Sequence, residues 1–167
     1  MATTFDPIAT TTLGSAASSI TFSSIASSWT DLRVVWTGSF ANAGGSRLSL
    51  RFNSDSGTNY SYTRLSGNGS AAASARNTNQ TDIIMGVSDI PQNLIHLNEI
   101  DVLSYAGSTF KTCLIGQSFD NNGSGWVFRQ VGLWRSTSAI TSITLLDYQG
   151  TNINAGTTAT LYGIKNA

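Results

Sequence analysis

Charged side chains are scarce in this sequence. Only 11% of its 167 residues are Asp, Glu, Lys or Arg, and nine acidic residues balance nine basic ones, so the formal net charge is zero. A typical globular domain is about 25% charged. Nucleic-acid binding and docking on anionic membranes both depend on clustered Lys and Arg, which this sequence lacks. We therefore predict no nucleic-acid partner and no membrane partner.

Residues that favour helices are scarce too. The sequence has one Glu and two Lys, the residues that normally occupy the exposed faces of helices. Ser, Thr, Asn and Gly account for 74 residues and favour strands and turns. Intrinsic disorder does not fit, because 40% of the residues are hydrophobic and 10% are aromatic. Since 167 residues is the size of one domain, the sequence predicts a single all-β domain with a packed core.

The residue types that most often carry catalysis are almost missing: His96, Glu99 and Cys113 are the only histidine, glutamate and cysteine. A structural zinc site needs four Cys or His ligands, and a lone cysteine cannot form an internal disulfide. We expect Cys113 to be a buried, inert thiol. A Ser-His-Asp triad built on His96 lacks the Gly-x-Ser-x-Gly turn, and the sequence has no phosphate-binding Gly-x-x-x-x-Gly-Lys-Ser/Thr loop. We predict no enzyme activity, no catalytic residue and no cofactor.

Three groups of oxygen-bearing side chains remain as candidates for chemistry. Glu99 and Asp101 lie two residues apart on an expected strand, where a polar outer face is favoured over a pair of glycosidase carboxylates. Residues 53–59 and 120–124 place oxygen-bearing side chains at alternate positions, as calcium loops do. Neither segment has the glycine at the sixth position or the bidentate acid of an EF-hand. Turn chemistry explains them, so we predict no metal site.

The sequence contains no run of about 18 apolar residues that could form a membrane helix. Its first residues also lack the basic and apolar regions of a signal peptide. We expect the protein to be made and folded in a cytoplasm.

Alternating apolar and polar residues predict a series of strands separated by turn signals. These strands are Ile20–Ile25, Leu32–Thr37, Leu48–Phe52, Tyr60–Leu65, Thr81–Val87, Leu94–Tyr105, Phe110–Ile115, Trp126–Trp134, Ile140–Leu146 and Thr158–Ile164. We expect Leu48–Phe52 and Tyr60–Leu65 to pair as a hairpin, and Ser66–Gln80 to form a long exposed loop.

This pattern indicates an antiparallel two-sheet β-sandwich, with a jelly roll as the preferred version. An immunoglobulin-like or other Greek-key order stays open. Residues 1–19 contain few large apolar side chains and are predicted to be an extended N-terminal arm. Residues 20–167 are predicted to form the single sandwich domain.

Aromatic side chains fall into two groups. Trp36, Phe128 and Trp134 lie within apolar strands, so we expect them in the core. Tyr60, Tyr62 and Trp126 flank polar loops and are candidates for stacking on sugar rings. Packing at a sheet edge or an interface is the favoured alternative for these three residues.

Several segments resemble β-rich virion proteins of tailed bacteriophages. They are Phe5–Ser15, Ile20–Ile25, Trp29–Leu32, Leu50–Asp55, Asn59–Ser61 and Gly156–Ile164. The resemblance extends over nearly the whole chain in short pieces. It implies a small structural protein of the particle, either a decoration (cement) protein on the capsid or a domain of the tail and its fibres. It transfers no catalytic residue to this sequence.

Because cement proteins typically form trimers over capsid three-fold positions, the resemblance implies a homotrimer in the virion that binds the major capsid protein or other virion proteins. We expect Phe5, Pro7, Ile8 and Leu13 of the arm to contact the partner. Decoration of the head is favoured because a single sandwich lacks the shaft of a long fibre. The alternatives are a tail-fibre or baseplate component that binds a receptor, and a carbohydrate-binding module. Apolar residues beyond one core's need, such as Val35 and Leu103, are candidates for a subunit interface.

Overall fold

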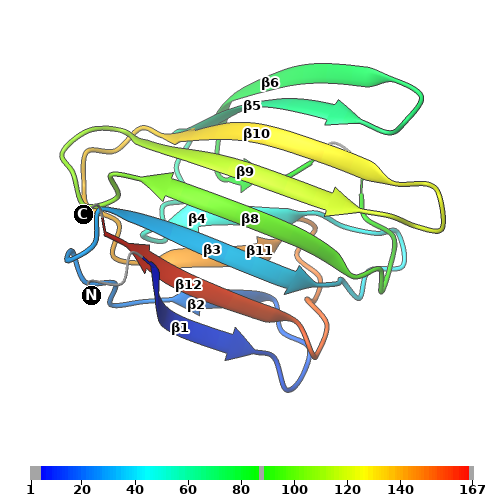
Figure 1. The fold of residues 1–167 in the computed structure, drawn as a ribbon, viewed down its shortest axis with the longest axis horizontal. Helices are drawn as coiled ribbons and strands as arrows, with labels where there is room; N and C mark the ends of the chain where they lie inside the picture. The colour runs from blue at the N-terminus through cyan, green and yellow to red at the C-terminus, as the bar shows by residue number, and fades with distance from the viewer. Residues whose placement is uncertain (1–4, 87–88, 166–167) are drawn as a thin grey trace.

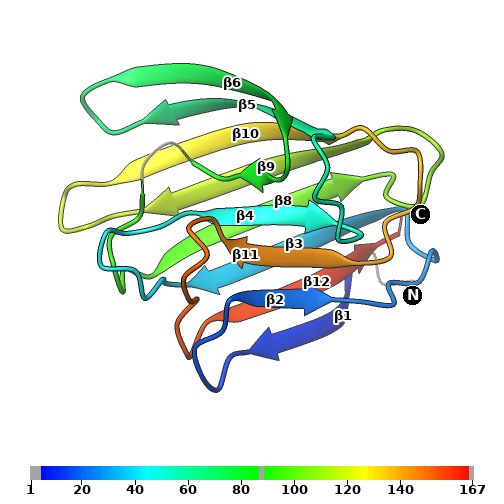
Figure 2. The same ribbon diagram turned by 180° about the vertical axis from the view of Figure 1, so that it is seen from behind.

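A computed structural model describes residues 5–86 and 89–165. The chain forms two antiparallel β-sheets that pack face to face, as Figures 1 and 2 show from opposite sides. The predicted all-β, antiparallel two-sheet sandwich is therefore confirmed. Among the described residues, no helix is long and apolar enough to cross a membrane.

The larger sheet has eight strands in the order β1-β12-β3-β8-β9-β10-β5-β6. Their bounds are β1 Phe5–Thr12, β12 Thr158–Ile164, β3 Asp31–Gly38, β8 His96–Leu103, β9 Lys111–Phe119, β10 Trp126–Trp134, β5 Tyr60–Gly67 and β6 Ala72–Gln80. The smaller sheet has four strands in the order β2-β11-β4-β7, with bounds β2 Ser19–Phe22, β11 Ile143–Asp147, β4 Leu48–Phe52 and β7 Ile83–Ile84. Strand β3 pairs with β12, β4 with β11 and β5 with β10, and these nested pairs alternate between the sheets as in a jelly roll.

Strict alternation along the strands builds the core between the sheets. In β3, Leu32, Val34 and Trp36 are fully buried, while the residues between them are partly exposed. Leu50 and Phe52 of β4 are likewise fully buried on the facing sheet. Phe128 and Trp134 are each 2% exposed, so the prediction that Trp36, Phe128 and Trp134 lie in the core is confirmed.

The predicted N-terminal arm is wrong for the described residues. Phe5–Thr12 form β1, which pairs with β12 from Phe5 opposite Ile164 to Thr12 opposite Thr158. Ile8 and Leu13 pack against the core. A segment poor in large apolar groups can still join a sheet, because backbone hydrogen bonds hold an edge strand in place.

Two predictions about residues 48–80 are also wrong. β4 lies in the smaller sheet and β5 in the larger one, so they do not form a hairpin. β5 instead forms a hairpin with β6, which occupies most of the segment predicted to be a loop. Of the strand predicted at Thr81–Val87, only β7 is present, and Val87 lies outside the described residues.

Candidate functional site

The outer face of the eight-stranded sheet, which points away from the smaller sheet, carries an exposed apolar patch. Its members are Leu65 on β5, Leu114 on β9, and Val127 and Val131 on β10, with exposed fractions of 63%, 46%, 62% and 41%. We call these four residues the outer apolar patch. Side chains alternate between the two faces of each strand, and these four point away from the core. They are therefore not buried within the monomer.

The strand register brings these side chains side by side. Val131 lies directly opposite Leu114 of β9 on one side and Thr63 of β5 on the other. Two residues along β10, Arg129 lies opposite Leu65. A hollow of about 290 Å³ opens between these side chains. The register therefore groups Leu65, Leu114 and Val131 around this hollow on three neighbouring strands, while the exposed Arg129 separates Val131 from Val127 on β10.

A charged strip borders the outer apolar patch on β3 and β8. Arg33 Nη2 lies 2.5 Å from Glu99 Oε1, and Arg33 Nη1 lies 3.6 Å from Asp101 Oδ1. Asp101 and Glu99 share the outer face, as the sequence predicted for residues two apart. Arg33 contacts both carboxylates, so the three side chains form a partly exposed ion-pair network with one positive and two negative charges.

Gly116 makes room for Arg129 between the strip and the patch. A side-chain carbon built on Gly116 would lie 2.7 Å from Arg129 Nη1 and 3.8 Å from Glu99 Oε2. The guanidinium group therefore extends over β9 at the one position of that strand's outer face that carries no side chain.

The aromatic residues proposed for sugar stacking do not form a site together. Tyr60 is fully buried, and its hydroxyl accepts a hydrogen bond from the Phe52 backbone N–H at 3.0 Å. Tyr62 is 3% exposed. The prediction that these two rings are available to a sugar is wrong, because their positions on β5 point between the sheets.

Trp126, the third of these aromatic residues, is partly exposed. Its ring stacks on Phe128 with centroids 5.5 Å apart and an interplanar angle of 2°. Trp126 lines an open hollow of about 550 Å³ at the ends of β5 and β9, together with Asn68 and Asp120.

Of the four residues expected to contact a partner, Phe5, Pro7 and Ile8 lie on β1, and Leu13 directly follows this strand. Phe5 is 47% exposed and packs against Tyr162, with ring centroids 5.9 Å apart. Pro7 is exposed beside a register shift, whereas Ile8 and Leu13 pack inward. They therefore offer no common apolar surface.

His96 is 3% exposed and packs against the rings of Trp36 and Phe40, with centroids 4.5 and 5.3 Å away. Burial lowers its pKa to about 4, although backbone hydrogen bonds to Leu94 and Gly38 act in the opposite direction. The imidazole is therefore neutral at pH 7. Burial also raises the pKa of Cys113 to about 12, so its thiol stays protonated.

The candidate calcium loops are occupied by internal hydrogen bonds. Asp55 accepts hydrogen bonds from Gly57, Asn59 and Trp134, while Asn53 bonds to the 139–142 segment. In the second loop, Asp120 accepts a bond from the Gly123 N–H. The part of the chain that the structure describes has no group of three or more His, Cys, Asp or Glu residues that could hold a metal ion.

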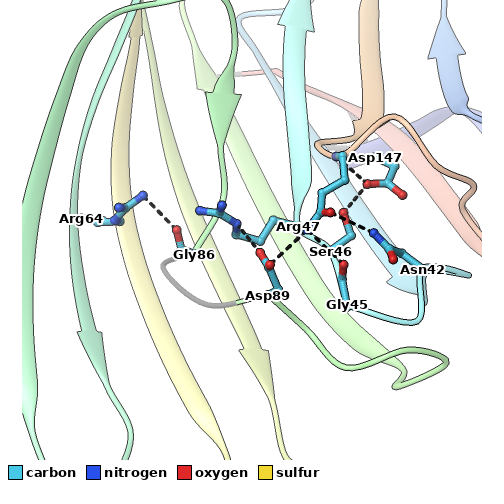
Figure 3. Close-up of polar contacts among 9 residues, drawn as sticks. Asn42, Gly45, Ser46, Arg47, Arg64, Gly86, Asp89 and Asp147 are labelled. Atoms are coloured by element: carbon cyan, nitrogen blue, oxygen red, sulfur yellow. Dashed lines mark hydrogen bonds and ion pairs between the residues drawn. The ribbon is translucent and has the colours of Figure 1, made fainter.

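Figure 3 shows polar contacts near one end of the smaller sheet. Arg47 Nε donates to Asp89 Oδ1 at 2.9 Å, and Ser46 donates to Asp147. Arg64 Nη1 donates to the Gly86 carbonyl at 2.9 Å. The Arg47–Asp89 and Arg64–Gly86 bonds hold the segments that flank residues 87–88 against the start of β4 and against β5.

Sequence reasoning missed the outer apolar patch, although a signal for it was present. The run Trp126–Trp134 contains apolar residues at both odd and even positions, more than one face of a strand needs for the core. Val35 and Leu103, singled out for the same reason, do lie on the outer face, where Leu103 is 40% exposed.

Comparison with known proteins adds little to this geometry. No protein-family model matches the sequence, and no curated protein matches it. Among solved structures, the galectin LEC-6 of Caenorhabditis elegans aligns with a TM-score of 0.41 and 12% sequence identity, over 94% of this chain and 96% of that chain.

Proposed function

We propose that this protein is a structural component of a tailed-bacteriophage particle, a decoration protein that docks the outer face of its larger sheet on a protein surface of the assembled head. The observation that carries the docking role is the outer apolar patch. Large contiguous apolar areas on the surface of a soluble protein usually serve as contacts with a partner. The assignment to a phage head comes from the sequence resemblance.

The charges on this face favour a protein partner of low charge. Arg33 is paired with Glu99 and Asp101, so the strip beside the patch keeps only one uncompensated negative charge. Protein interfaces combine an apolar centre with a polar rim in this way. The low overall charge of the chain fits a protein held against neighbours by shape and apolar contact.

The test measures how many copies of the protein purified particles hold, by quantitative gel analysis. The double variant Leu65→Asp/Val127→Asp is expected to lower the copy number about tenfold, because burying an unpaired charge costs at least about 1.4 kcal/mol. Thr37→Asp is the control for a carboxylate added outside the patch: it places one charge on the same face, at an exposed position of β3.

Occupancy that is unchanged in the double variant would remove the docking role of the patch. The copy number of the wild type separates the two virion locations, since a decoration protein is present in hundreds of copies and a tail component in far fewer. Absence of the wild-type protein from purified particles would overturn the proposal.

A carbohydrate-binding module is the second candidate, and it depends on the Trp126 hollow. A partly exposed indole beside amide and carboxylate side chains can stack on a sugar while the polar side chains bind its hydroxyls. Glycan-array binding that is lost in Trp126→Ala would support this function. An array without signal would remove it.

A further inference from the structure

Strand β6 is an unprotected edge of the larger sheet. It pairs only with β5, and none of its nine residues is buried. Figures 1 and 2 show the β5–β6 hairpin at the outer end of the sheet. A long free edge presents unpaired backbone N–H and C=O groups, which favour pairing with another strand.

The hairpin turn shows which backbone groups of β6 face outward. The Asn68 N–H donates to the Ala71 carbonyl at 3.3 Å, so these residues form a hydrogen-bonded pair. Bonded and non-bonded pairs alternate along an antiparallel ladder. The non-bonded pairs are therefore Gly67–Ala72, Leu65–Ser74 and Thr63–Arg76. Ala72, Ser74 and Arg76 direct their N–H and C=O groups to the free edge.

The other edges among the described strands are short or interrupted. β2 has four residues and β7 has two. β1 has eight residues, but Pro7 lacks an N–H and the register shifts between Pro7 and Ala9. β6 contains no proline, and its register shift lies at the far end, where it leaves Ala72–Asn77 regular. Natural edges are often blocked by proline or by a register shift, and Ala72–Asn77 of β6 has neither.

We infer that β6 pairs with β6 of a second copy of this chain, antiparallel, about a two-fold axis at Ser74. This register joins all three outward-facing residues in reciprocal hydrogen bonds: Ser74 opposite its symmetry mate, and Ala72 opposite Arg76 of the partner subunit. It makes one continuous sheet from the larger sheets of both copies. The interface is isologous and closed, as in most homodimers.

Side-chain sizes and charges fit this register. Arg76 lies opposite Ala72 of the partner subunit. Within each chain, Ala72 on β6 is paired with Gly67 on β5, so the long arginine side chain meets two small residues. Within its own chain, Arg76 Nε donates to Thr63 Oγ1 at 3.2 Å, which holds the guanidinium over the outer face. A register centred on Arg76 would place two like charges opposite each other, which is unfavourable.

This inference does not depend on the proposed function, and it differs from the three-fold assembly that the sequence resemblance implies. Sedimentation equilibrium of the isolated protein tests it, because the wild type is expected to have the mass of two chains. Hydrogen exchange by NMR gives a residue-level readout. The amides of Ala72, Ser74 and Arg76 are expected to exchange slowly, although none of them bonds within the monomer.

Ser74→Pro is the decisive variant. Proline removes one outward N–H while leaving the hydrogen bonds between β5 and β6 intact, and edge strands tolerate proline at such positions. The variant is expected to be a folded monomer, and Ser74→Ala, which keeps the N–H, is expected to remain a dimer. Ser74→Asp gives a second test if the proline variant fails to fold, because it places two carboxylates at the axis.

A monomeric or trimeric wild type would overturn the inference. A dimer that persists in Ser74→Asp, or fast exchange of the three outward amides in a dimer, would overturn it as well. Loss of particle binding in the Leu65→Asp/Val127→Asp variant, with the dimer intact, would leave it standing.

Discussion

Trp134 on β10 donates a hydrogen bond from its indole N–H to Asp55 Oδ2, 2.7 Å away in the loop between β4 and β5. The tryptophan is 2% exposed and packs against Phe52 and Tyr60. One carboxylate therefore satisfies a buried donor in the larger sheet and, through Gly57 and Asn59, fixes the loop that leaves the smaller sheet.

Replacing Asp55 with Ala is expected to destabilise the protein by about 1–3 kcal/mol at pH 7, because it leaves the buried indole N–H without a partner. Burial raises the pKa of Asp55. Hydrogen bonds from Trp134, Asn59 and Gly57 together lower this pKa by more than burial raises it, so the net shift is downward. The stabilisation is therefore present above the ordinary carboxyl pKa of 3.8 and is lost as the pH falls through the lower folded value. Urea unfolding at pH 7 and in acid measures both effects. An equal cost at the two pH values would contradict this account.

His96 is expected to make the protein acid-sensitive. Its pKa falls from an ordinary value of 6.5 to about 4 in the folded protein, so the unfolded chain takes up a proton first. Stability is at its full value above pH 6.5 and decreases as the pH falls to about 4, by roughly 3 kcal/mol in total. In His96→Phe, denaturant midpoints measured across this range are expected to lose most of that slope. A variant with the wild-type slope would assign it to other groups.

Gly163 on β12 is expected to tolerate no side chain. A carbon added there would lie 2.1 Å from the Trp29 ring, which packs directly on the strand backbone. Gly163→Ala should displace the indole, lower the free energy of unfolding by about 1–3 kcal/mol and shift the tryptophan fluorescence. Gly14→Ala is the matched control, since nothing lies within 4 Å of its added carbon, and it should leave the melting temperature unchanged. Equal melting temperatures for the two variants would refute the packing argument.

Removing residues 1–13 is expected to destabilise the domain, in contrast to the removal of an independent arm. The deletion eliminates the packing of Ile8 and Leu13 on the core, where each buried methylene contributes about 0.8 kcal/mol. It also exposes the edge of β12 along its whole length. Thermal melting should shift downward, and light scattering should reveal aggregation. An unchanged melting temperature would show that β1 contributes nothing to the fold.

The sequence predicted those strands that have a buried face and a strict alternation. Thr158–Ile164 and Leu48–Phe52 agree with the structure at both ends, because a strand buries apolar side chains that recur at every second position. Trp126–Trp134 also agrees at both ends, although its apolar residues occupy both faces of the strand. β6 was missed because it is exposed on both faces, so its Ala, Ser and Asn residues carry no periodic signal.

Partner choice between strands could not be predicted. The hairpin expected between residues 48 and 65 was inferred from a turn sequence, but β4 and β5 belong to different sheets. The same limit affected the candidate site. Tyr60 and Tyr62 flank polar segments in sequence, yet their position on β5 faces the core, and only the three-dimensional register shows that Leu65, Leu114 and Val131 meet.

The pairing of β1 with β12 also bears on synthesis of the chain. The hydroxyls of Thr12 and Thr158 lie 2.9 Å apart, although 146 residues separate them in sequence. During translation β1 emerges before β12 and stays without its partner strand until β12 has been made. A nascent strand rich in threonine and poor in large apolar groups is less prone to aggregate during that wait. The composition of the first strand thus suits the order in which the ribosome delivers the two halves of the pair.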